Sequence, residues 1–326
     1  MNLLVTGGAG YIGSATSAAL LAAGHQVTVY DNLSKGFRNA LPVGARFVHG
    51  DIGDAQALTK VFAETAFDGV LHFASLIEAG ESMRDPGTYF RANVAHSNVV
   101  LNAVAQAGVP NFVLSSTAAV YAGSDQPLRE DSLIQPANVY GHTKLMIEQM
   151  LAWYRQIYGL NYAVLRYFNA CGAVPERGEA HQPETHLIPN VFKVALGQRD
   201  SFQLFGTDYP TPDGTCIRDY IHIADLASAH TLAVMALPEK GCMTYNLGTG
   251  HGYSIREIVS AAREITGHPI PLIEQARRPG DAPRLVADPS KIAQELGWRA
   301  KYSSLENILK TAWNWHQNHP YGYVNG

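Results

Sequence analysis

The sequence has little cysteine, little net charge and no long hydrophobic run. Its three cysteines, Cys171, Cys216 and Cys242, lie far apart in 326 residues. This spacing excludes a disulfide framework and a cysteine zinc site, and it suits a reducing compartment. The formal net charge is −4 and the sequence pI is near 6.3, so nothing in the composition favours nucleic acid or an anionic membrane surface as a partner. No stretch approaches the roughly 20 apolar residues that cross a bilayer, and the first apolar run is too short for a signal peptide. We therefore expect a cytoplasmic protein.

Metal-ligand patterns are also missing. The 13 histidines are scattered, and His181 and His186 are close in sequence without the spacing of ligands on one helical face. We expect no metal site. The apolar fraction of 46% is enough for a packed core, and the length suits one large domain or two unequal ones.

The first part of the chain alternates short apolar runs with longer helical patterns. Strands are expected at 3–6, 26–30, 46–49, 69–73, 111–115 and 162–166, and helices at 11–23, 55–64, 88–107 and 139–158. Such alternation predicts the α/β class, with a doubly wound, Rossmann-like parallel sheet covered by helices on both faces.

The rhythm changes after about residue 170, where two loops rich in proline and glycine occur at 170–185 and 206–215. Helices are expected at 187–196, 223–236, 254–266, 289–296 and 305–318, and short strands at 203–205, 244–247 and 270–273. We therefore predict a nucleotide-binding domain at 1–170 and a smaller α/β substrate-binding domain at 171–326, with some later segments returning to the first domain.

A glycine-rich loop follows the first strand and opens the first helix. Residues 7–13 read Gly-Gly-Ala-Gly-Tyr-Ile-Gly. Glycines at Gly7, Gly10 and Gly13 let the backbone approach a pyrophosphate, and the helix N-terminus favours its negative charge. A glycine-rich loop alone is weak evidence, but here both the strand and the helix are present. We expect a bound dinucleotide.

Two acidic residues end the next strands. Asp31 lies about 20 residues beyond the glycines, where a carboxylate accepts from both ribose hydroxyls and repels a 2′-phosphate, so NAD is favoured over NADP. Lys35 and Arg38 follow, so NADP is not fully excluded. Asp51 is expected at the adenine end, or alternatively as the cap of a turn.

Residues 138–144 read Asn-Val-Tyr-Gly-His-Thr-Lys, which places Tyr140 and Lys144 one helical turn apart on one face. The strand that closes with Ser115-Ser116-Thr117 reaches the same edge of the predicted sheet. A phenol, an ammonium and a hydroxyl thus converge on the nicotinamide. Tyrosine is a poor base near neutral pH, and a nearby cation lowers its pKa. Lys144 together with the nicotinamide charge is expected to bring Tyr140 near working pH, and Thr117 to share the substrate proton.

This constellation resembles the extended short-chain dehydrogenase/reductases, and further strings resemble the UDP-glucose 4-epimerase family. They are Val-Thr-Gly-Gly-Ala-Gly-Tyr-Ile-Gly-Ser at the start of the chain, then 31–33, 72–74, 165–169, 205–211 and 218–222, the last reading Arg-Asp-Tyr-Ile-His. The resemblance runs from residue 1 to about 320. It implies that Tyr140 takes the proton of a sugar 4′-hydroxyl during hydride transfer to NAD, and that both return after the sugar turns.

The resemblance also implies the residues that bind each ligand. Cofactor contacts are expected at Gly7, Gly10, Tyr11, Ile12, Gly13, Asp31, Asn32, Asp51, Ile52, Phe73, Ala74, Ser75, Asn93, Ser115, Tyr140, Lys144 and Phe168. Substrate contacts are expected at Thr117, Tyr140, Asn169, His186, Leu187, Phe205, Arg218, Arg278, Asp281 and Leu285.

Several of these roles have alternatives. Phe205 is expected against uracil, with a core aromatic as the alternative. Arg218 and Arg278 are expected on the diphosphate. The alternative for Arg218 is a surface ion pair with Asp219, and the alternative for Arg278 is a solvated charge. Leu285 bears on the size of the sugar, so N-acetylhexosamine and pentose substrates stay open.

Two other functions fit the fold. A nucleotide-sugar 4,6-dehydratase needs acid-base groups directly after the threonine, where this chain has Ala118 and Ala119. An NAD-sensing regulator has no need for Tyr140 with Lys144. One lysine that many family members carry near the cofactor is absent, since the chain reads Ser75-Leu76-Ile77 there. Family members pair through long helices, and we expect a homodimer through 88–107 and 139–158. The alternative is that these two helices only cover the sheet.

Overall fold

The computed structural model describes residues 1–278 and 281–323, and its main feature is a seven-stranded parallel sheet. The strand order is β11-β6-β5-β4-β1-β2-β3. The strands are β1 (Asn2–Thr6), β2 (Gln26–Asp31), β3 (Arg46–His49), β4 (Gly69–His72), β5 (Asn111–Thr117), β6 (Asn161–Tyr167) and β11 (Cys242–Leu247). The order reverses between β1 and β4, and such a switch point opens a crevice at the carboxyl edge. The predicted fold class is confirmed.

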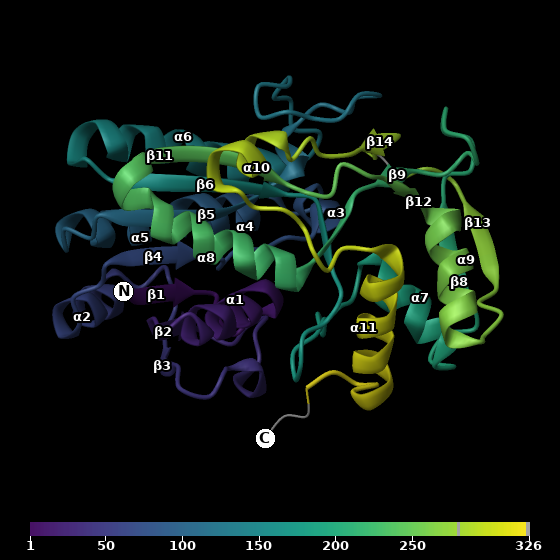
Figure 1. Ribbon diagram of the computed structural model, residues 1–326, viewed down its shortest axis with the longest axis horizontal. Coiled ribbons are helices and arrows are strands. Elements are labelled where there is room, and N and C mark those ends of the chain that lie inside the picture. The colour runs from purple at the N-terminus through teal and green to yellow at the C-terminus, as the bar shows by residue number, and fades with distance from the viewer. Residues whose placement is uncertain (279–280, 324–326) are drawn as a thin grey trace.

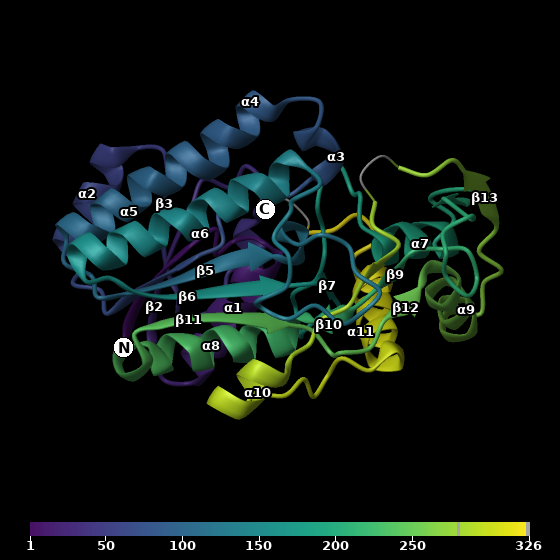
Figure 2. The same ribbon diagram turned by 90° about the horizontal axis from the view of Figure 1, so that it is seen from above.

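Helices cover both faces of this sheet (Figures 1 and 2). One face carries α2 (Ala55–Glu64), α5 (His96–Gln106) and α6 (Val139–Tyr158), and the other carries α1 (Tyr11–Ala22), α8 (Ile223–Lys240) and α10 (Ser290–Leu296). Successive residues of a strand point to opposite faces. Leu3 and Val5 of β1 accordingly enter the core on the α1/α8 side, while Leu4 enters the core under α2 and α5.

A segment expected as one helix at 88–107 is interrupted. It consists of α4 (Pro86–Tyr89), a π-helical turn η2 (Phe90–Ala95) and α5. The buried Asn93 lies in the π-helical turn, where its side chain bonds Leu76 and Thr143. The short helix α3 (Ala79–Ser82) precedes it, and the 3-10 turns η1 (Arg38–Ala40) and η3 (Ala118–Val120) follow β2 and β5.

A smaller lobe lies beyond the carboxyl edge of the sheet, on the right in Figure 1. Its helices are α7 (Leu187–Ala195), α9 (Ile255–Thr266) and α11 (Leu305–Asn318), which share one hydrophobic core. Its strands pair in short sheets: β7 (Asn169–Cys171) with β10 (Tyr220–His222), β8 (Phe202–Phe205) with β13 (Leu272–Gln275), and β9 (Ile217–Arg218) with both β12 (Tyr253–Ser254) and β14 (Arg284–Leu285).

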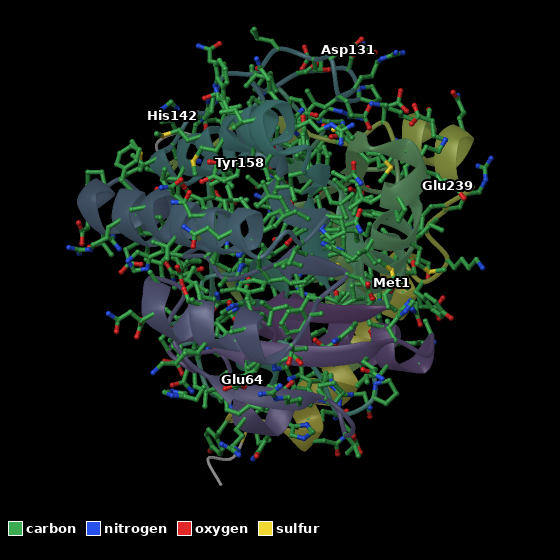
Figure 3. The ribbon with its side chains drawn as sticks, turned by 90° about the vertical axis from the view of Figure 1, so that its left-hand side faces the viewer. Met1, Glu64, Asp131, His142, Tyr158 and Glu239 are labelled. Carbon is green, nitrogen blue, oxygen red and sulfur yellow. The ribbon has the colours of Figure 1, made fainter. Side chains whose placement is uncertain are left out.

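Some later segments pack with the first part of the chain. β11 pairs with β6, from Cys242 opposite Tyr162 to Leu247 opposite Tyr167. α8 and α10 contribute Leu226 and Ile292 to the core around β1. Figure 3 views this layered body end-on, with Tyr158 at the end of α6 on the side away from the smaller lobe. Among the described residues, no helix is both long and apolar enough to pass through a membrane.

Candidate active site

A cavity of about 1350 Å³ lies between the carboxyl edge of the sheet and the smaller lobe. Its wall includes the glycine loop, the ends of β2, β4 and β5, the start of α6, and residues of α7, β8 and β14. Pockets for one drug-sized ligand are commonly about 300–1,000 Å³. This cavity therefore has room for two elongated ligands meeting end to end.

The glycine loop forms one end of the cavity and is built for close approach. Gly7 has a φ of 72°, and a Cβ there would collide with the backbone of Ala74. A Cβ on Gly13 would collide with the Gly7 carbonyl. Gly10 is the N-cap of α1, and no side chain caps that end, so the helix dipole faces the cavity. These features fit the pyrophosphate of a dinucleotide. Tyr11 and Ile12 complete the loop along the cavity wall.

Two carboxylates lie where the adenosine end was expected. Asp31 is buried at the end of β2, and its carboxylate accepts from the Ala9 and Leu33 amides at 3.0 and 2.8 Å. Burial raises the pKa of Asp31 in spite of these bonds. Asp51 accepts from Asn32 Nδ2 and from the Gly53 amide, each at 2.7 Å. Both carboxylates line the cavity, so Asp51 caps a turn and also faces the cavity.

Tyr140 lies in the first turn of α6, beside Thr117 at the end of β5. Asn138 caps the helix by accepting from the Gly141 amide at 2.8 Å, and the Tyr140 amide donates to Ser82 Oγ at 3.1 Å. Thr117 and Tyr140 both line the cavity, and a hydrogen bond between their side chains lowers the pKa of the phenol. The two groups expected to handle the substrate proton are thus together.

Lys144 is placed differently from the expectation. It is 1% exposed, its Nζ donates to the Ser115 carbonyl at 2.9 Å, and it lies behind the cavity wall instead of lining it. Burial lowers the pKa of Lys144 to about 7, and Glu148 partly opposes this. Ser115 itself lines the cavity, and its hydroxyl is hydrogen-bonded to Tyr167.

The expected lowering of the tyrosine pKa is not produced by the protein's own groups. Burial raises the pKa of Tyr140 to about 12, the Thr117 hydrogen bond opposes this, and the Glu78 carboxylate adds to it. Spacing on a helix gives the position of Lys144 but not the depth at which both side chains lie. The expected shift also relied on the nicotinamide charge, so it stays a prediction for the NAD-bound protein.

The remaining expected cofactor residues fall into two groups. Ile52, Phe73, Ala74, Ser75 and Phe168 line the cavity. Asn93 does not. Its amide donates to the Leu76 carbonyl and to Thr143 Oγ1, both at 3.0 Å, and its oxygen accepts from the Leu76 amide. Asn93 therefore shapes the segment after β4 from behind.

Besides Thr117 and Tyr140, the other expected substrate residues also line the cavity. They are Asn169, His186, Leu187, Phe205, Arg218, Arg278, Asp281 and Leu285. The Arg278 guanidinium lies 4.0 Å from the ring centre of Phe205, so this ring is not simply a core aromatic. Arg218 pairs with Asp281 at 3.7 Å. Its expected alternative partner Asp219 is buried.

The carboxylate of Asp219 instead accepts backbone hydrogen bonds from Thr249, Gly250 and Ala287. Arg218 therefore lines the cavity without the ion pair that its sequence neighbour suggested.

Several residues of the cavity wall carry no signal in the sequence. Lys35 reaches the buried Glu78 at 3.4 Å, and Tyr89 donates to the same carboxylate at 3.1 Å. Lys35, from the loop after β2, thus lies against the segment after β4, where many family members carry a lysine that this chain lacks. Glu179 and Glu184 also line the cavity, close to His181 and His186. Residues 172–186 fold across the glycine loop, and this brings the two glutamates and two histidines together at the cavity wall. The Tyr11 hydroxyl, for example, donates a hydrogen bond to the Gly172 carbonyl at 2.6 Å.

Comparison with known proteins relates the chain to a family of enzymes. The model of the NAD dependent epimerase/dehydratase family matches residues 3–248. A UDP-glucose 4-epimerase of Halalkalibacterium halodurans is 49% identical over 99% of this chain and 98% of its own length.

Solved structures agree. The UDP-glucose 4-epimerase of Brucella ovis in complex with NAD has a TM-score of 0.93 at 47% identity, covering 96% of this chain and 97% of that one. The enzyme of Bifidobacterium longum in complex with NAD⁺ and UDP has a TM-score of 0.95 at 36% identity, covering 99% of this chain and 100% of that one.

Proposed function

The chain belongs to the NAD dependent epimerase/dehydratase family, and from that premise we propose that it is an NAD-dependent UDP-glucose 4-epimerase. The observation that carries the proposal is one continuous cavity with a dinucleotide loop at one end, Tyr140 and Thr117 in the middle, and two arginines at the other. A protein that only senses NAD would not need the second end. The alanines after Thr117 leave no acid-base pair for dehydration.

NAD fits the first end because the glycine loop has no space for a Cβ and Asp31 and Asp51 face the cavity. When bound, it supplies a reversible hydride acceptor. The residues that would hold it are Gly7, Gly10, Gly13 and Asp31, with Phe73, Ala74 and Ser75 along the cavity wall.

Tyr140 moves the proton. Its phenol oxygen takes the proton of the sugar 4-hydroxyl as C4 becomes a ketone, and gives it back after the sugar has turned its other face. Thr117, hydrogen-bonded to the phenol, shares this proton. Lys144 holds the Ser115 carbonyl and places positive charge behind the site. Arg218 and Arg278 would anchor the diphosphate, so that the sugar turns while the nucleotide stays fixed.

The same proposal includes the division of labour along the chain, with residues 1–170 mainly holding NAD and residues 171–326 mainly holding the UDP-sugar. It also includes a homodimer and a cytoplasmic location. Trp153, Ile157 and Tyr158 of α6 are 61%, 64% and 60% exposed, and such apolar surface favours a partner. The cysteines Cys171, Cys216 and Cys242 are free, which suits a reducing compartment.

The test is an assay of the purified protein with UDP-glucose and no added cofactor. We expect UDP-galactose to form, because the hydride returns to the substrate and no net redox occurs. Parallel incubations with UDP-N-acetylglucosamine and UDP-xylose show which sugars fit beside Leu285. Absence of a galactose isomer while another UDP-sugar is converted would reassign the substrate. Absence of any conversion by NAD-loaded protein would refute the proposal.

A further inference from the structure

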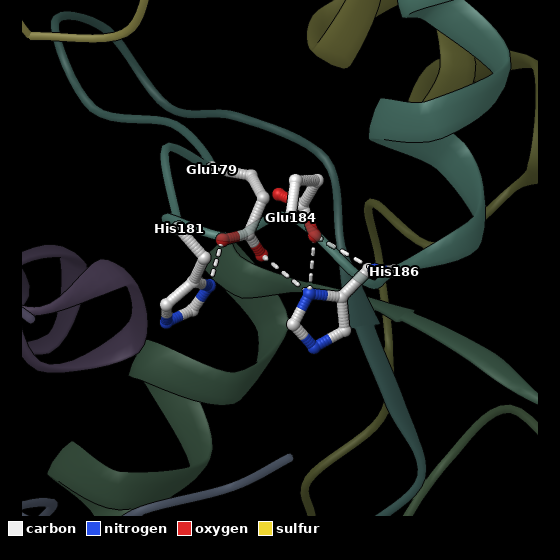
Figure 4. Close-up of side chains that lie close together, drawn as sticks. All are labelled: Glu179, His181, Glu184 and His186. Atoms are coloured by element: carbon white, nitrogen blue, oxygen red, sulfur yellow. Dashed lines mark hydrogen bonds and ion pairs between the residues drawn. The ribbon is translucent and has the colours of Figure 1, made fainter. Parts of the chain in front are cut away.

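Two glutamates and two histidines form a compact cluster at the cavity wall (Figure 4). Glu179, His181, Glu184 and His186 each offer an atom, and these atoms all lie within 4.8 Å of one another. Glu179 pairs with His181 through one oxygen, and its other oxygen lies 4.0 Å from His186 Nδ1. The side chains of Glu179 and Glu184 are 8% and 2% exposed.

Glu184 fixes the orientation of His186 with one carboxylate oxygen. That oxygen accepts from the His186 backbone amide at 2.7 Å and from its Nδ1 at 2.8 Å. His186 is the N-cap of α7, so the two bonds set both the ring and the start of the helix. With Nδ1 turned to the carboxylates, Nε2 is the ring nitrogen left for a ligand. The His186 side chain is 38% exposed and lines the cavity.

The charges around His186 keep it protonated. Burial lowers the pKa of His186, but the carboxylates of Glu179 and Glu184, with a smaller contribution from Glu78, outweigh burial and raise it to about 9. The His181 ring lies 5.3 Å away, and His186 in turn lowers the pKa of His181, while Lys35 is paired with Glu78. Glu179 responds in the opposite sense. Burial raises its pKa, but the two histidines outweigh burial and lower it to about 2.

A protonated histidine facing a cavity with two arginines is suited to an anion. We propose that Glu184 is a positioning residue, which holds His186 oriented and positively charged toward the diphosphate of the substrate. The inference rests on the proposed function for the identity of the substrate. A carboxylate at the cavity wall would by itself repel a diphosphate. The inference gives Glu184 a role there, because it acts only by orienting and charging His186.

The test is the pH profile of KM for UDP-glucose in the NAD-loaded Glu184→Gln variant. Glutamine keeps an acceptor for the His186 amide but removes one charge, so the pKa of His186 falls below 9. A histidine is cationic below its pKa. The wild type therefore keeps the charge up to about pH 9 and the variant loses it earlier, while the diphosphate charge stays constant. We expect equal KM values near pH 6 and a KM about tenfold or more higher for the variant at pH 8 to 9, with kcat little changed.

Two further variants separate positioning from a structural effect. In His186→Asn, which has no ring proton, KM should no longer vary through this pH window. Adding Glu184→Gln to that variant should change KM no further, because the pathway through His186 is already gone. Glu64→Gln, a charge loss at an exposed position on α2, should leave the profile unchanged.

The outcomes that overturn the inference are distinct from failure of the proposed function. A KM increase in Glu184→Gln that is the same at all pH values, or that persists in the His186→Asn background, would show a merely structural role. If EDTA raised KM in the wild type as Glu184→Gln does, the cluster would hold a metal ion instead of charged histidines. Loss of all conversion of UDP-sugars by the wild type would instead refute the proposed function.

Discussion

In the proposed mechanism, Tyr140 acts as a base and then as an acid on the same oxygen of the substrate. Burial raises the pKa of this phenol to about 12, and the neighbouring Glu78 carboxylate adds to the rise. In the protein alone the phenol is therefore held protonated, ready to donate. Taking a proton requires further positive charge near the phenol, which NAD⁺ would supply when bound.

Replacing Tyr140 with phenylalanine tests this role. We expect Tyr140→Phe to lower kcat about 100-fold to 10,000-fold, the usual contribution of a positioned acid-base group. The ring and its packing remain, so the thermal midpoint and the NAD content should stay near those of the wild type. Turnover of UDP-glucose and absorbance of bound cofactor are the measurements.

Tyr158→Phe is the matched control, because that tyrosine is 60% exposed at the far end of the same helix. It should keep full turnover. Equal kcat values for the wild type and Tyr140→Phe would remove Tyr140 from the chemistry.

At the scale of elements, the position of Tyr140 depends on how α6 is fixed to the sheet. Glu148 of α6 and Arg166 of β6 form a buried ion pair, with Nε to Oε1 at 3.0 Å and Nη2 to Oε2 at 2.5 Å. Ser116 of β5 donates to the same carboxylate, and Tyr121 accepts from Arg166 at 2.8 Å. The helix that carries Tyr140 is thereby tied to two strands.

Removing one partner of this pair should be costly. Arg166→Met leaves Glu148 as an unpaired buried charge, and we expect the free energy of unfolding to fall by about 3–5 kcal/mol in denaturant titrations. The double variant Glu148→Leu with Arg166→Met removes both charges and should recover much of that loss. Lys310→Met breaks the exposed pair with Glu306 and should leave the free energy of unfolding nearly unchanged. A similar small change for Arg166→Met would mean that the buried pair does not fix α6.

The regular elements were predictable because their patterns are local. The helices expected at 55–64, 139–158 and 305–318 have those limits in α2, α6 and α11. The expected strand at 46–49 likewise matches β3. The sequence shows the apolar spacing of α6, an asparagine before its first turn and a glycine after its last. In the structure Asn138 caps the helix, and Gly159 ends it with a φ of 73°.

The misses have physical reasons. The π-helical turn in 88–107 changes the hydrogen-bond register without a clear break in the apolar pattern, so the sequence reads as one helix. The strands β7, β9, β10, β12 and β14 have two or three residues each, too few for an alternation to appear. α8 continues past the expected end at 236 to Lys240 with Pro238 in its last turn.

The sequence predicted which residues belong to the site better than it predicted how deeply their side chains are buried. The glycine loop, Asp31, Thr117 and Tyr140 line the cavity as expected, because their positions follow from strand ends and helix starts. Lys144 and Asn93 lie behind the wall. The pairing of Glu184 with His186 depends on the path of an irregular loop, which no periodic pattern describes.

At the scale of the whole molecule, the proposed homodimer would pair through the exposed side of α6. Trp153 and Ile157 lie one turn apart on it, and two-fold pairing would bury both copies of each. We expect Ile157→Glu to convert a dimer to a monomer, because pairing would bury the new charge, as measured by light scattering after size exclusion.

Val43→Glu is the control, since Val43 is 98% exposed in the loop before β3, away from α6. It should remain dimeric. If the wild type is already a monomer, or if Ile157→Glu stays a dimer, the α6 surface is not the interface.

The late return of β11 to the main sheet has a consequence for how the protein is made. On the ribosome, β6 is complete once Tyr167 has emerged, but its outer edge stays unpaired until Leu247 follows. The apolar residues Ile292 and Trp298, which close the core on the α8 side, emerge later still. Nascent chains therefore carry an open strand edge and uncovered apolar surface through much of synthesis. Their yield in the cell should depend on how well chaperones shield that edge until the last part of the chain is released.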